Sequence, residues 1–271
     1  MSLRRIVKYI LLLVLLAAIG IGLYCYYQAQ REPEAYQPTP MSPEQAHVVA
    51  QEFINRKILE EFGNKTQLNK PFDWTLTQQQ ANEALASTDE IAFLLGGKRG
   101  DIERQLERQG LSQPAVQFLD DRVVLMVRSK KYDKVLSVEL SFTLLPDGRL
   151  SVQMEAVRVG RLSVPISLVE TELMALRGSQ AASAPAATQS SQGFGMVRAK
   201  DIGKILKAVF GAIDGKPIQP VLKWPVNHKK VSVKSVELVE GMMTLHLEPV
   251  AADKSAESEP VELPDILSLP G

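Results

Sequence analysis

Residues 135–164 read VLSVELSFTLLPDGRLSVQMEAVRVGRLSV and carry the clearest strand pattern in the chain. Apolar residues occupy every second position on both sides of a Pro-Asp-Gly turn at 146–148. Alternation of period two around such a turn is typical of two antiparallel strands with one face toward a core. Because both strands are long for an isolated hairpin, we expect them to form the centre of an antiparallel sheet.

The second strand of this hairpin contains a change of phase. Apolar residues occupy even positions up to residue 156, but Val157 and Val159 are apolar at odd positions, and Gly160 follows them. A shift of one residue beside a glycine predicts a β-bulge or a strand buried on both faces. The even phase then resumes, so we expect the same strand to bend near Gly160 and to continue to about Val164.

The N-terminus has the features of a membrane anchor. Basic residues lie within residues 1–8, and the apolar run at 9–27 is about as long as a membrane-spanning helix. The rule that positive charge stays inside places residues 1–8 in the cytoplasm and everything after the run outside it. Tyrosines at its end suit the far interface. We therefore predict a single-pass membrane protein with an uncleaved signal anchor and an extracytoplasmic main domain.

Three other interpretations of the apolar run fit it less well. A cleaved signal peptide has a shorter apolar core followed by small residues, whereas Tyr-Cys-Tyr-Tyr-Gln stands at 24–28. A lipoprotein anchor at Cys25 would need a small residue in place of Tyr24. A buried core helix is rarely so uniformly apolar at the extreme terminus of a chain.

The rest of the chain divides by composition. Residues 28–42 are rich in proline and polar residues and predict a stalk. Residues 43–250 have the composition of a folded α+β domain, interrupted at 178–192 by a low-complexity loop of Ala, Ser and Gln. Residues 251–271 are acidic and contain prolines, which predicts a disordered tail.

Two segments of this domain, 43–62 and 197–214, repeat apolar residues at helical spacing. The predicted fold is therefore α+β, with an N-terminal transmembrane helix and a curved antiparallel sheet packed on these amphipathic helices. A sheet coiled around a helix leaves room for an apolar groove, although ordinary core packing is the better-supported interpretation of each residue that would line it. The candidate groove residues are Phe142, Met154, Ile205, Val209 and Phe210.

The sequence offers no constellation for catalysis. The histidines at 47, 228 and 246 are scattered, and the one cysteine, Cys25, lies in the apolar run. No recognised nucleophile, metal-ligand or phosphate-binding spacing occurs, and the Gly-rich loop at 96–100 lacks that of a P-loop. The balance of 31 basic and 31 acidic residues argues against nucleic acid as a partner. We expect no enzymatic activity, no metal and no cofactor.

A helix pattern led by threonine, TLTQQQANEAL at 75–85, precedes the strands and the segment from Asp147 to Pro165. In this order the pattern resembles the YpmS-like family of single-pass, membrane-anchored bacterial envelope proteins of unknown function, over residues 72–177, with Asn82 at the place of a recurrent asparagine. The resemblance implies an envelope location and carries over no catalytic residue. The layout is also similar to tubular lipid-binding domains, in which a coiled sheet wraps a long helix around an apolar groove.

Two functions remain open at this point. The first is a non-enzymatic, membrane-tethered envelope module that binds lipid or another apolar ligand. The alternative is a scaffold or partner-binding subunit of an envelope complex, with a solid core and no ligand. In both, the partners are the membrane, through the N-terminal helix, and a lipid or an envelope protein. An apolar groove around the candidate residues would favour the ligand-binding module, and a packed core around them would favour the scaffold.

Overall fold

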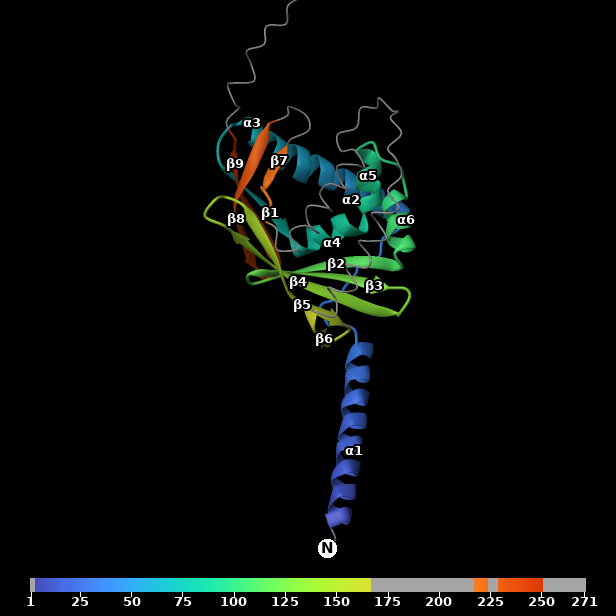
Figure 1. Ribbon diagram of the computed structural model, residues 1–271. Coiled ribbons are helices and arrows are strands. Elements are labelled where there is room, and N and C mark those ends of the chain that lie inside the picture. Colours follow the sequence, from blue (N-terminus) through green and yellow to red (C-terminus); the bar gives the residue numbers. More distant parts are fainter. Residues whose placement is uncertain (1–2, 167–216, 224–228, 251–271) are drawn as a thin grey trace, which may run out of the picture.

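The computed structural model describes residues 3–166, 217–223 and 229–250 (Figure 1). Within these ranges the chain forms one long N-terminal helix, several shorter helices and two antiparallel sheets, which confirms the α+β class. The predicted helix at 197–214, the loop at 178–192 and the tail at 251–271 lie outside the described residues. The helices are α1 (Leu3–Gln30), α2 (Pro43–Glu52), the π-helix η1 (Phe53–Gly63), α3 (Asn64–Gln67), α4 (Gln78–Ala86), α5 (Thr88–Leu94) and α6 (Asp101–Arg108).

The strands form two sheets, whereas the sequence led us to expect one. The strands are β1 (Phe72–Thr77), β2 (Leu111–Leu119), β3 (Arg122–Ser129), β4 (Lys134–Leu144), β5 (Leu150–Val159), β6 (Leu162–Val164), β7 (Val221–Lys223), β8 (Lys230–Val239) and β9 (Met242–Pro249). A 5-stranded sheet has the order β2-β3-β4-β5-β6, and a 4-stranded sheet has the order β1-β9-β8-β7. Alternation shows which face of a strand is apolar, but it does not show which strands pair. The division of the strands into two sheets could therefore not be predicted from it.

The hairpin of β4 and β5 is the longest pairing in the 5-stranded sheet, and its bulge is confirmed. Glu139 pairs with Ala156 and Leu140 pairs with Met154, so Glu155 is the extra residue. The extra residue moves the apolar positions from even to odd numbers while keeping them on one face of the sheet. Val157, opposite Val138, therefore continues the face begun by the even-numbered residues.

The expected continuation of that strand to Val164 is wrong. β5 ends at Val159, and the chain reverses through Gly160 and Arg161 into β6, with Val159 paired to Leu162. Gly160 has a φ of 59°. This conformation suits glycine and is common in two-residue hairpin turns. The glycine that suggested a bend in the sequence is therefore the corner of a second hairpin.

The edge of β2 is covered by side chains of α4. The Asn82 side chain donates to the Val116 carbonyl at 2.9 Å and accepts from the Val116 N–H at 2.7 Å. The Gln78 side chain accepts from the Phe118 N–H at 3.0 Å. These side-chain amides take the place of a neighbouring strand, so they block the edge from pairing with another chain.

The edge of β1 is covered in a similar way from η1 and α3. Lys57 Nζ donates to the Thr75 carbonyl at 3.3 Å, and Lys65 Nζ donates to the Asp73 carbonyl at 3.0 Å. Trp74 Nε1 donates back to the Lys57 carbonyl at 3.2 Å. The wider turn of a π-helix brings side chains roughly four to five residues apart onto one side. Lysine on an exposed edge also discourages pairing with another sheet.

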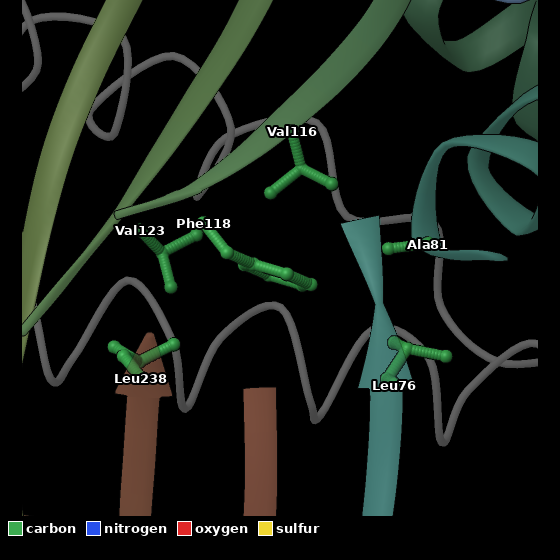
Figure 2. Packing of buried hydrophobic residues seen from close by; sticks show 6 residues of the cluster. All are labelled: Leu76, Ala81, Val116, Phe118, Val123 and Leu238. Carbon is green, nitrogen blue, oxygen red and sulfur yellow. The ribbon is translucent and has the colours of Figure 1, made fainter. Parts of the chain in front are cut away.

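The two sheets meet at an apolar core closed by α4. Leu76 and Leu238 come from the 4-stranded sheet, Phe118 and Val123 from the 5-stranded sheet, and Ala81 from α4. Figure 2 shows these side chains, together with that of Val116, converging on one space. Burial of apolar surface at this junction is what holds the sheets and the helix together.

We predict that Asn82→Ala destabilises the domain by about 1–3 kcal/mol, because it leaves the buried Val116 N–H and carbonyl without their partner. Urea unfolding followed by circular dichroism measures the change. Gln79→Ala on the exposed side of α4 is the matched control, with an expected change below about 0.5 kcal/mol. Equal effects of the two substitutions would contradict a specific role for Asn82.

Candidate functional site

Phe142 and Met154 pack into the core. Both lie around the buried pair Leu140 and Val152, together with Ile218, and Phe142 also contacts the core at the junction of the sheets. The other three candidate groove residues, at 205, 209 and 210, lie outside the described part of the chain. Met154 therefore makes ordinary core contacts, whereas Phe142 makes core contacts and also lines an open depression.

An open depression of about 440 Å³ lies where the two sheets meet. Its apolar lining comes from Phe142 and strand β8, and its carboxylates are Asp120, Asp121 and Glu237. Asp120 accepts from the Glu240 N–H at 3.1 Å, and the Asp121 N–H donates to the Leu238 carbonyl at 3.4 Å. These turn residues therefore tie the β2–β3 turn to the β8–β9 turn. Their surface is acidic and open to solvent, with apolar side chains beneath it.

Beyond this depression, His246 on β9 links three of the four strands of the 4-stranded sheet on its outer face. Its Nδ1 lies 2.6 Å from Asp73 Oδ1 on β1, and its Nε2 lies 3.4 Å from Glu237 Oε2 on β8. The hydrogen bond to Asp73, followed by the effect of Glu237, raises the pKa of His246 above its ordinary value of 6.5. This is the arrangement of an ionic contact across a sheet.

A second histidine joins helices. His47 Nδ1 on α2 lies 3.1 Å from Glu90 Oε2 on α5, and Arg99 Nε lies 2.7 Å from Glu90 Oε1. The hydrogen bond from His47, helped by Arg99, holds the pKa of the buried Glu90 carboxyl below its usual value. The neighbouring basic loop at 96–100 thus contributes a structural ion pair. Among the described residues, no three His, Cys, Asp or Glu side chains are placed to hold a metal ion.

The C-terminal end of α1 makes a close backbone contact with the β5–β6 turn. α1 is long and apolar enough between Leu13 and Gln30 to cross a membrane, although a signal sequence has the same properties. A Cβ atom at Gly160 would lie 2.5 Å from the Ala29 carbonyl oxygen and 2.6 Å from that of Arg31. Glycine is therefore required here by space as well as by its φ. Backbone lies directly against backbone where the helix reaches the sheet.

Arg161 strengthens this contact. Its N–H donates to the Gln28 carbonyl at 3.0 Å, so one of the open carbonyls at the end of α1 is satisfied by the turn. Its guanidinium donates to the Glu32 carbonyl at 3.0 Å and to the Glu34 carboxylate at 2.8 Å. A cation at the C-terminal end of a helix also interacts favourably with the helix dipole.

The segment after α1, which we expected to act as a stalk, runs along the 5-stranded sheet. Tyr36 is buried against Ala115 and Met126, and its hydroxyl donates to the Gln113 carbonyl at 2.9 Å. Burial raises the pKa of Tyr36. Beside it, Arg128 forms an ion pair with Glu32, whose hydrogen bond raises the pKa of the guanidinium. Residues 31–36 therefore fix the helix to the sheet.

These contacts are only partly predictable from the sequence. Gly160 stands out by its position in the strand pattern, whereas Tyr36 lies among polar residues and prolines with no periodicity. A lone aromatic residue in such a segment is the one signal that points to burial. The partners of both residues come from distant parts of the chain, so spacing could not identify them.

Comparisons of the chain with protein-family models, with curated proteins and with solved structures give no match. The resemblance to the YpmS-like family therefore stays a prediction.

We predict that Gly160→Ala destabilises the protein by more than Gly148→Ala. Both glycines have positive φ, 59° and 78°, but only a Cβ at position 160 meets other atoms. Gly148→Ala should cost about 1 kcal/mol from backbone conformation alone. The additional loss in Gly160→Ala, measured by thermal unfolding in detergent, reports the contact with α1. Equal losses would contradict it.

We predict that the stability supplied by His246 is present below about pH 6.5 and is lost as the pH rises through the raised pKa of the folded state. Because the pair is largely solvent-exposed, its size should stay below about 1 kcal/mol. Urea midpoints of the protein and of His246→Gln, compared at pH 6 and pH 8.5, measure the loss. In NMR titrations, Asp73→Asn should lower the pKa of His246, and an ordinary pKa in the unsubstituted protein would disprove the contact.

Proposed function

We propose that the protein is a non-enzymatic, single-pass membrane module that holds a partner-binding domain in a fixed orientation at the membrane surface. The contact of Gly160 with the end of α1 carries this proposal. A flexible stalk would let the domain explore every orientation, whereas backbone contact and the ion pairs of residues 32 and 34 restrict it. The expected extracytoplasmic side and the bacterial envelope location belong to the same proposal.

The partner surface that we favour is the acidic depression between the sheets together with the outer face that carries His246. Val239, 37% exposed, lines this depression and offers an apolar contact beside Asp121 and Glu237. An apolar centre with a charged rim is the usual composition of a protein interface.

The packing of Phe142 and Met154 favours this scaffold over a module that encloses a lipid. The apolar-ligand alternative requires the 5-stranded sheet to curve around the helix expected at 197–214 and to leave a groove. Met154 contacts other core side chains, and Phe142 contacts core side chains and lines a depression that is open to solvent and does not enclose a ligand. The scaffold therefore has more support from the described part of the chain.

A photoreactive benzoylphenylalanine at Val239, introduced into the full chain in its own membrane, should form an adduct with one protein. Val48 on α2, 62% exposed, is the matched control and should give none. A flexible Gly-Ser segment inserted after Gln30 should lower the Val239 adduct severalfold while the chain stays in the membrane, because it separates α1 from the sheet.

Lipid extraction of the purified chain distinguishes the two functions. The scaffold predicts no lipid in stoichiometric amount, and a single lipid species at one copy per chain would favour the apolar-ligand alternative. An adduct yield that is unchanged by the inserted segment would contradict the fixed orientation.

A further inference from the structure

The depression at the junction of the sheets lies along one edge of β8. Four consecutive residues of the strand, 236–239, line it together with Phe142 and the turn at 120–121. Successive side chains of a strand point to opposite faces, so a hollow on one face would touch only every second residue. The Leu238 side chain points into the core (Figure 2), so the depression meets this residue at its backbone.

No described strand pairs with this part of the edge. The opposite edge of β8 is paired with β9 along nearly its whole length. On the edge that faces the depression, β7 pairs only with residues 230–232, and the Val233 N–H donates to the Pro220 carbonyl at 2.8 Å. The chain before Pro220 leaves β8, because Ile218 pairs with the first residue of β5. Among the described residues, positions 234–237 therefore have no neighbouring strand on this edge.

The backbone of this edge is directed into the depression. The Leu238 carbonyl accepts from the Asp121 N–H at 3.4 Å across the edge. Alternate residues of a strand direct their backbone groups to the same side, so the N–H and carbonyl of Val236 point the same way. The open stretch at 234–237 is about 13 Å long, enough for a short extended segment to lie beside it. An unpaired edge of this kind is the binding surface in β-strand addition.

This edge also lacks the cover that the edges of β1 and β2 have. There, lysine and amide side chains from preceding helices bond to the strand backbone. Lys234, the lysine of the open stretch, instead forms an ion pair with Glu248 of β9 at 3.1 Å. Within the described residues, the edge of β8 is therefore left available to another chain.

The charge around the open edge is negative. The carboxylates of Asp120, Asp121 and Glu237 are all on exposed residues that line the depression. Arg122, the cation next to Asp121 in the chain, pairs with Glu139 at 3.2 Å. Asp121 has no ion pair in the described part of the chain, so its charge is available to a partner. Complementary charge guides association and fixes the register of an interface.

We propose that the partner binds by adding a short extended segment to the edge of β8 at residues 234–237. Basic side chains of this segment lie toward Asp121 and Glu237, and an apolar side chain lies against Phe142. The proposal rests on the proposed function in one respect, that the depression is the partner surface. The occupant is a strand of another protein that carries lysine or arginine. Main-chain hydrogen bonds supply the affinity, and the alternating side chains supply the specificity.

The test uses the full chain in lipid nanodiscs and a fluorescent peptide of alternating lysine and valine. Fluorescence anisotropy measures binding. A peptide of the same length with alternating glutamate and valine is the control for charge. Two further lysine peptides carry methyl groups on the backbone nitrogens, either of the lysines or of the valines. Each of them blocks one edge of the peptide strand, because alternate N–H groups point to opposite sides.

The lysine peptide should bind more tightly than the glutamate peptide. One of the two methylated peptides should lose affinity about tenfold, the equivalent of one main-chain hydrogen bond at the upper end of its usual contribution. The other should retain its affinity, because an added strand bonds along one edge only. These two peptides have the same composition, so a difference between them reports the hydrogen-bonded edge.

Variants of the chain locate the site. Asp121→Asn should lower the affinity for the lysine peptide about two- to fivefold, as expected for an exposed ion pair. Asparagine tolerates the φ of 64° at this position, so the turn is preserved. Glu60→Gln, at an exposed position of η1, is the matched control and should change nothing. Benzoylphenylalanine at Val239 should form an adduct with the lysine peptide, and at Val48 it should not.

Equal affinity of both methylated peptides, or no preference for lysine over glutamate, would overturn the strand addition. If Val239 still forms its adduct with one protein in the membrane, the proposed function stands and only this mode of binding falls. An adduct of Val239 with a second copy of the chain, or with residues 167–216 of the same chain, would reveal another occupant and overturn the proposal. The expected peptide pattern in a chain that forms no protein adduct in the membrane would contradict the proposed function and support the edge site.

Discussion

The orientation of the domain depends on one close approach, that of Gly160 to the carbonyl oxygens of Ala29 and Arg31. Two backbones lie in contact there, so the geometry tolerates little variation. Arg161 then satisfies the Gln28 carbonyl and bonds to residues 32 and 34. Because α1 and the 5-stranded sheet meet in this way, the surfaces of the domain have a defined position relative to the helix axis.

One edge of each sheet shows how the domain avoids pairing with the strands of other chains. Asn82 and Gln78 occupy the edge of β2, and Lys57 and Lys65 occupy the edge of β1. In each case polar side chains of a helix that precedes the strand in sequence form hydrogen bonds with the backbone of the strand. The edges of β1 and β2 therefore cannot accept an added strand from another chain.

Local pattern was sufficient for some elements. The pairing of β4 with β5, the phase change before Val157 and the helix that begins at Pro43 all follow from period, turn residues and capping. Ser42 at the start of α2 and Thr77 at the start of α4 both form the reciprocal bonds of a capping box. The π-helical geometry of η1 was not foreseen, because the apolar spacing at 53–62 fits an ordinary helix equally well.

The ion pairs described above join residues that lie far apart in the chain. His246 meets Asp73, and Glu90 meets His47. A charged residue in a sequence is expected to be exposed to solvent unless the sequence indicates a partner for it. Here the partners are brought together only by the strand order and the packing of the helices.

The sequence by itself determined the apolar N-terminal helix, the α+β class and the alternating faces of the strands, because these depend on the composition and period of neighbouring residues. The tertiary structure alone decided that the strands form two sheets, that the chain reverses at Gly160, and that residues 31–36 lie on the sheet. These features depend on which distant backbones and side chains meet, and a period in the sequence carries no information about the partner that a face will find.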